Sequence, residues 1–65
     1  MPKYDDVTVK LVGQDGNVFV IIGKVSRALR RAGHRDGMLD YTNAAQECES
    51  YEAVLRLTMD TVNVE

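Results

Sequence analysis

Residues 18–32 read VFVIIGKVSRALRRA, and the spacing of their apolar side chains predicts an α-helix. At about 100° per residue, most of these side chains fall within one arc and form a stripe that would face the core. The stripe consists of Val18, Ile21, Ile22, Val25, Ala28, Leu29 and Ala32. Asn17 stands where an N-cap belongs, and Gly33 supplies the left-handed residue that ends many helices. Phe19 and Val20 fall outside the arc, so we expect them to cover a strand edge or form a small exposed patch.

The segment before this helix alternates β-branched and polar residues, which is typical of a half-buried strand. Within residues 7–12, the strand would turn one set of side chains to the core: Val7, Val9 and Leu11. Thr8 and Lys10 would point outward. Residues 13–16 read GQDG, and this composition predicts a turn between the strand and the helix.

Two further helices are predicted after Gly33. Asp36 would cap a helix over residues 37–49, and Ser50 would cap a helix over residues 51–60. The apolar side of the first would hold Met38, Tyr41, Ala44, Ala45 and Cys48. That of the second would hold Tyr51, Val54, Leu55, Thr58, Met59 and Val62. No glycine or proline divides the two segments, so a single bent helix is the alternative.

The chain closes on an alternating segment, TVNVE at residues 61–65, which places Val62 and Val64 on one face. A terminal strand needs a partner, and residues 7–12 are the only candidate. We therefore predict one small α+β domain over residues 1–65, in the order β-α-α-α-β. Two short strands would pack against the helices.

Charge is segregated along the chain. The 65 residues are enough for one domain, and their net charge is only −2. Residues 24–35, however, carry five basic residues and no acid, whereas residues 36–65 carry seven acids and one arginine. A domain of this size buries only about 60% of the surface of its unfolded chain, so self-association or a partner chain is worth considering.

Cysteine usage and hydropathy exclude several classes of protein. Cys48 is the only cysteine, which excludes an intramolecular disulfide and a zinc site built on several cysteines. On the apolar side of its helix it is interpreted as a buried structural thiol. The longest apolar run, residues 18–22, is far shorter than the ~20 residues that span a bilayer. Residues 1–6 are polar and acidic, unlike a signal peptide. We expect a cytoplasmic protein with no cofactor, metal or membrane contact.

The residue pattern predicts no catalytic site. The turn before Asn17 lacks the motifs of nucleotide-binding loops, and Asp15 would repel a phosphate. The aspartates at residues 5–6 are interpreted as solvated residues of a terminus, and His34 as a surface histidine at a helix end. An enzyme would need Asp15, Asn17 and His34 to meet in space. We therefore expect a protein that is not an enzyme.

A basic stripe on the first helix is the strongest candidate for a binding site. Its members, spaced i, i+3, i+7 and i+11, are Lys24, Arg27, Arg31 and Arg35. The stripe could be a solvated face that pairs with the acidic C-terminal half of the chain. It could also dock on an acidic protein surface, including a second copy in a twofold dimer, or contact nucleic-acid phosphates.

Two features argue against nucleic acid. The following helix is acidic, and no aromatic platform is interleaved with the basic residues. We therefore predict an accessory or regulatory protein that binds another protein, or itself, through the basic stripe. Phe19 and Val20 are candidate apolar anchors, and nucleic-acid binding is the alternative.

Three segments carry a resemblance to known sequences. They are DGNVF at residues 15–19, VSRALRRAG at residues 25–33 and MDTVNV at residues 59–64. Together they resemble a group of small proteins of unknown function from bacteria, notably actinobacteria, and from their phages and mobile elements. The resemblance implies a cytoplasmic bacterial or phage origin. It carries over no catalytic or binding residue.

Overall fold

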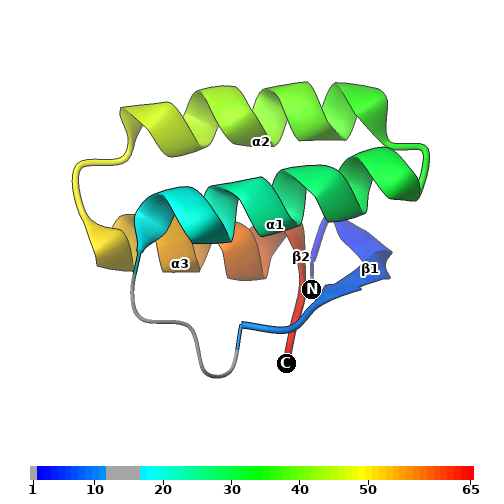
Figure 1. The fold of residues 1–65 in the computed structure, drawn as a ribbon, viewed down its shortest axis with the longest axis horizontal. Helices are drawn as coiled ribbons and strands as arrows, with labels where there is room; N and C mark the ends of the chain where they lie inside the picture. The colour runs from blue at the N-terminus through cyan, green and yellow to red at the C-terminus, as the bar shows by residue number, and fades with distance from the viewer. Residues whose placement is uncertain (1, 12–16) are drawn as a thin grey trace.

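The chain begins and ends in strands that pair with each other, and three helices connect them (Figure 1). A computed structural model describes residues 2–11 and 17–65. The elements are β1 (Tyr4–Val9), α1 (Val18–Arg31), α2 (Arg35–Glu47), α3 (Tyr51–Thr61) and β2 (Val62–Val64). The predicted α+β order β-α-α-α-β is thereby confirmed. Val12 and the turn predicted over residues 13–16 lie outside the described residues.

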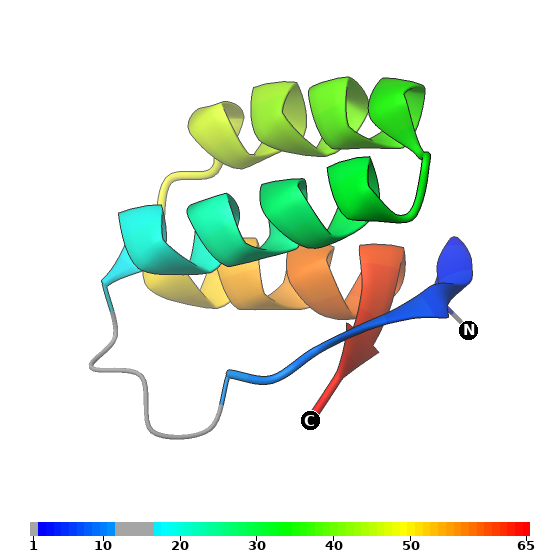
Figure 2. The same ribbon diagram turned by 45° about the vertical axis from the view of Figure 1, so that its right-hand side comes forward.

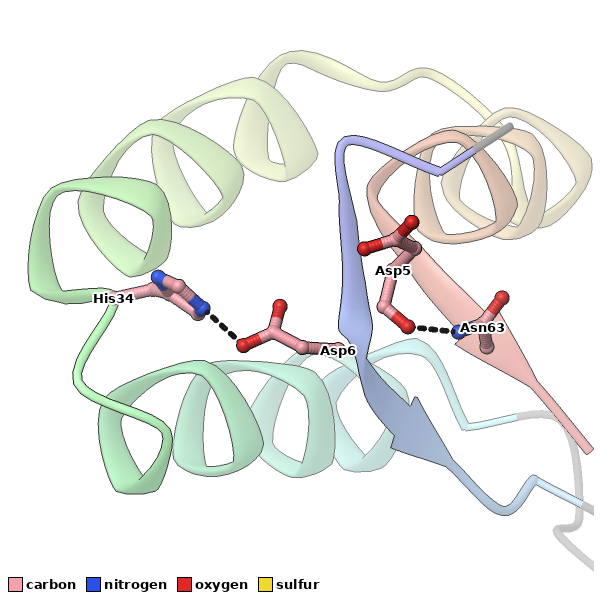
Figure 3. A network of polar contacts seen from close by, with 4 residues as sticks. All are labelled: Asp5, Asp6, His34 and Asn63. Atoms are coloured by element: carbon pink, nitrogen blue, oxygen red, sulfur yellow. Dashed lines mark hydrogen bonds and ion pairs between the residues drawn. The ribbon is translucent and has the colours of Figure 1, made fainter.

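The two strands run parallel, with an irregularity in β1. Tyr4 is aligned with Val62, whereas Thr8 is aligned with Asn63, so β1 carries extra residues between these pairs. The Asn63 side-chain amide donates a hydrogen bond of 2.7 Å to the Asp5 carbonyl and thereby satisfies a backbone group of the irregular segment (Figure 3). Beyond it, regular pairing continues past the strand ends, because the Glu65 amide donates to the Val9 carbonyl.

The helices form two levels over the sheet (Figure 2). Helix α1 packs on β1 and α3 packs on β2, while α2 runs alongside α1 and packs on both α1 and α3, on the side away from the strands (Figures 1 and 2). One cluster of buried apolar side chains joins all five elements. It consists of Val7, Val9, Ile21, Val25, Leu29, Tyr41, Ala45, Val54 and Val62. The alternation predicted for Val7 and Val9, and the centre of the stripe predicted for α1, are confirmed.

The helix ends follow from local chemistry. The Asn17 side chain accepts from the Phe19 amide, and the Ser50 side chain accepts from the Ala53 amide, so both predicted N-caps are confirmed. Gly33 has φ of 88°, the left-handed conformation that ends α1. The segment at residues 48–50 separates α2 from α3, which excludes a single bent helix.

The cap predicted for the second helix is wrong. Helix α2 begins at Arg35, and its N-cap residue, His34, makes no side-chain capping bond. The left-handed Gly33 reverses the chain within the turn, so the new helix begins two residues earlier than predicted. Asp36 instead lies in the first turn of α2, where a negative charge interacts favourably with the helix dipole.

The predicted apolar faces of α3 and α1 each include residues that the structure places at the surface. Tyr51 and Met59 are exposed, because α3 turns the side centred on Val54 and Thr58 to the core. Thr61 is buried there, and its hydroxyl donates to the Leu57 carbonyl at 2.7 Å. Ala32 is exposed because α1 ends one residue before it.

Among the described residues, no helix has the length and apolar character needed to cross a membrane.

Candidate functional site

Helix α1 lies antiparallel beside β1. At one end, the Lys24 ammonium donates a hydrogen bond of 2.9 Å to the carbonyl of Lys10, just after β1. At the other end, Arg31 lines a hollow together with Asp6 and Thr8 of β1. The buried residues of α1 hold this arrangement, because they pack into the same core as Val7 and Val9. The face of α1 next to its buried side therefore lies beside the edge of β1 that faces away from β2.

A groove separates this face of α1 from β1. It has a volume of about 330 Å³, and we call it the basic groove. Its lining residues are Thr8, Val9, Lys10, Lys24, Arg27, Ala28 and Arg31. Four of the seven are cationic and none is acidic. A groove with this lining attracts an anionic group of a ligand.

The structure divides the predicted basic stripe. Lys24, Arg27 and Arg31 lie together on the groove, whereas Arg35 does not. Arg35 belongs to the first turn of α2 and lines a separate hollow with Arg30 and Met38. The spacing that relates Arg35 to the others holds only for one continuous helix, and α1 ends before it. Lys10 joins the site from β1 instead, a residue that the sequence placed only on the outward face of a strand.

The basic residues of the groove are not neutralised by the acidic half of the chain. Within residues 2–11 and 17–65, the only ion pair joins His34 to Asp6. Among these same residues, Arg27 and Arg31 have no carboxylate within ion-pair distance, and Lys24 is bonded to a backbone carbonyl. The interpretation of the stripe as a face that pairs internally is therefore not realised in the described part of the chain.

A second polar cluster lies at the N-terminal end of β1 (Figure 3). The His34 Nε2 atom lies 2.8 Å from the Asp6 carboxylate, and the His34 ring contacts the Tyr4 ring in a tilted arrangement, with ring centroids 4.6 Å apart. The hydrogen bond from His34 is the main cause that lowers the pKa of Asp6 below its ordinary value of 3.8. Asp6 is therefore tied to the α1–α2 turn, contrary to its interpretation as a freely solvated residue.

The residues of the enzyme hypothesis do not meet. Asn17 precedes α1 and His34 follows it, and a helix of 14 residues is about 21 Å long. Asp15 lies outside the described residues. Among the described histidines, cysteines and acids, no group of three is placed to hold a metal ion. Cys48 is half-buried against the core, and its thiol donates weakly to the Ala44 carbonyl.

Of the two candidate anchors, Phe19 is the more exposed. Its side chain is 83% exposed and that of Val20 is 37% exposed, so they form the predicted exposed patch. They lie in the first turn of α1 and do not line the basic groove.

Comparison of the chain with protein-family models, with curated proteins and with solved structures finds no match. The resemblance to small bacterial and phage proteins stays a prediction.

Proposed function

We propose that this protein is a small accessory or regulatory protein that acts by binding rather than by catalysis. The binding site is the basic groove, and the partner is a protein that presents an acidic surface or segment. One observation carries the proposal: Lys10, Lys24, Arg27 and Arg31 surround one groove in which none of the described lining residues is an acid. Charge complementarity of this kind directs association and selects against partners of like charge.

Nucleic acid is the alternative ligand for the same cations. A protein partner is favoured because the whole chain has a net charge of −2 and seven acids follow residue 35. These acids raise the cost of approaching a long polyanion, whereas a short acidic segment meets only the groove.

A selection experiment tests the proposal without a known partner. The full chain is immobilised and challenged with a library of random twelve-residue peptides and, separately, with a pool of random oligonucleotides. Enrichment of acidic peptides is the expected result. Nucleic-acid binding would instead enrich oligonucleotides, with an affinity that falls steeply with salt, since each phosphate contact adds about −0.9 to the slope.

Two charge-reversal variants locate the binding site. The first, Arg27→Glu with Arg31→Glu, reverses charge in the groove. The second, Arg30→Glu with Arg35→Glu, changes the net charge equally on the other side. We expect the groove variant to bind the selected peptides roughly tenfold more weakly, because an exposed ion pair contributes up to about 1 kcal/mol and reversal makes it repulsive. The second variant should retain binding within about twofold. Equal losses in both variants, or none in either, would refute the groove as the site.

A further inference from the structure

The basic groove borders an unused strand edge. The sheet contains only β1 and β2, so the edge of β1 that faces away from β2 has no strand beside it within the described residues. Two-stranded sheets are marginal, and such edges are common docking sites for extended peptides. We propose that the acidic partner segment binds as a third strand on this edge, an inference that rests on the proposed function.

Backbone geometry identifies the groups that this edge offers. The Val9 carbonyl and the Leu11 amide both bond to Glu65 beside β2, so their backbone groups point toward β2. Because backbone groups alternate direction along a strand, those of Thr8 and Lys10 point to the free edge. Of these, the Lys10 carbonyl already accepts from Lys24. Within residues 2–11 and 17–65, no hydrogen bond to the Thr8 amide, the Thr8 carbonyl or the Lys10 amide is found, so these three groups can pair with an incoming strand.

The edge is limited at both ends. At the C-terminal end of the edge, the Lys24 side chain already bonds to the Lys10 carbonyl. At the N-terminal end, the Asp6–His34 ion pair lies across the edge just before Val7. A partner strand can therefore pair only near Thr8 and Lys10, where the groove lies. The short window fits one segment of a few residues rather than a long extension of the sheet.

The spacing of the arginines matches a strand. Arg27 and Arg31 are four residues apart on α1, which corresponds to about 6 Å along the helix axis. Side chains on one face of a strand repeat every two residues, or about 6.6 Å. A segment with acidic residues at alternate positions would thus place two carboxylates opposite the two guanidinium groups.

The same charges decide against other occupants. Two copies of this chain that joined their β1 edges about a twofold axis would set one basic groove against the other, and these like charges would repel. Nucleic acid cannot complete the ladder, because it lacks the alternating amide and carbonyl groups that Thr8 and Lys10 require. An extended acidic segment of another protein satisfies both the backbone groups and the cations.

The test uses an eight-residue peptide of alternating glutamate and valine, blocked at both ends, and the full chain. Two further peptides carry N-methyl groups on alternate backbone amides, one on the glutamates and the other on the valines. A bound strand turns only one of these sets toward β1. We expect one N-methylated peptide to bind about tenfold more weakly than the parent, since the N–H that donates to the Thr8 carbonyl is lost and the methyl group blocks close approach of the strands. The other should bind within about threefold of the parent. Whether N-methylation of the glutamates or of the valines weakens binding also shows whether the added strand is parallel or antiparallel to β1.

The charge-reversal variants separate this inference from the proposed function. If Arg27→Glu with Arg31→Glu weakens binding while both N-methylated peptides bind like the parent, the groove binds acids but not as a strand, and the inference is overturned. If the groove variant binds the parent peptide as tightly as the native chain does, the proposed function fails as well. Weaker binding of one N-methylated peptide, together with weaker binding of the parent peptide to the groove variant, supports both the strand inference and the proposed function.

Discussion

The hydrogen bond between Tyr41 and Thr58 allows a sharp test of how α2 is fixed to α3. Both side chains are buried, and their oxygens lie 2.8 Å apart. The single hydroxyl proton of Thr58 is donated to the Val54 carbonyl. Tyr41 must therefore be the donor between the two hydroxyls, and a chain of hydrogen bonds runs from Tyr41 through Thr58 to Val54.

This direction makes the two single substitutions unequal. Tyr41→Phe removes a donor but leaves the Thr58 proton bonded, so we expect a loss of about 1 kcal/mol in the free energy of unfolding. Thr58→Val leaves the buried Tyr41 hydroxyl without an acceptor, and that costs about 1–3 kcal/mol. In the Thr58→Val background, Tyr41→Phe should become neutral or stabilising, because it removes the orphaned hydroxyl. The sign of the Tyr41→Phe effect thus reverses between the two backgrounds.

Thermal and urea unfolding of the four chains measures these differences. For a domain of this size, 1 kcal/mol shifts the Tm by about 4–8 °C. Tyr51→Phe is the matched control, since Tyr51 is partly exposed and its hydroxyl has no hydrogen bond to a described residue; we expect a change within about 0.5 kcal/mol. If Tyr41→Phe destabilises both backgrounds equally, the direction of the bond is wrong.

Three further predictions concern local features. Asp6→Asn should remove a contribution to the free energy of unfolding that is present above about pH 4 and is lost as the pH falls through the lowered pKa of Asp6. Acid unfolding curves of the variant that coincide with those of the native chain would contradict the hydrogen bond to His34. Gly33→Ala should lower the free energy of unfolding by about 1–2 kcal/mol, because Gly33 has a positive φ. Gly23→Ala, inside α1 with open space around its Cβ position, should raise the free energy of unfolding by about 0.5–1 kcal/mol. Equal Tm values for the two variants would refute this account. Phe19→Ser should leave the unfolding free energy within about 0.5 kcal/mol, and should weaken binding of selected peptides only if Phe19 anchors the partner, which titrations of the two chains decide.

Much of the fold follows from periodicity and from residues with local roles. The stripe around Val25 predicts α1, and Asn17, Gly33 and Ser50 set helix ends through bonds or a backbone conformation that depend on few neighbours. The start of α2 was predicted from Asp36 alone, as a favourable N-cap residue, whereas the chain reversal at Gly33 determines the observed boundary. The exposure of Met59 could not be predicted, because α3 alone does not reveal which of its sides meets β2.

The site was predictable only in part. The i, i+3, i+7 spacing brings Lys24, Arg27 and Arg31 together, because one helix carries all three. Lys10 was not linked to them, since its place in the groove depends on α1 packing antiparallel to β1, a contact between segments distant in the chain. The Asp6–His34 pair likewise joins residues 28 apart in sequence, and no local pattern indicates it.

The most direct test of the central claim is a titration of the ¹⁵N-labelled full chain with the alternating glutamate–valine peptide, followed by amide chemical shifts. We predict that the largest changes occur at Thr8, Lys10 and Ala28, which line the basic groove. The amides around Arg35 and Met38, which line the hollow on the other side of α1, should change little. Changes centred on that second hollow, or spread evenly over both, would contradict the claim that the groove beside β1 is the binding site.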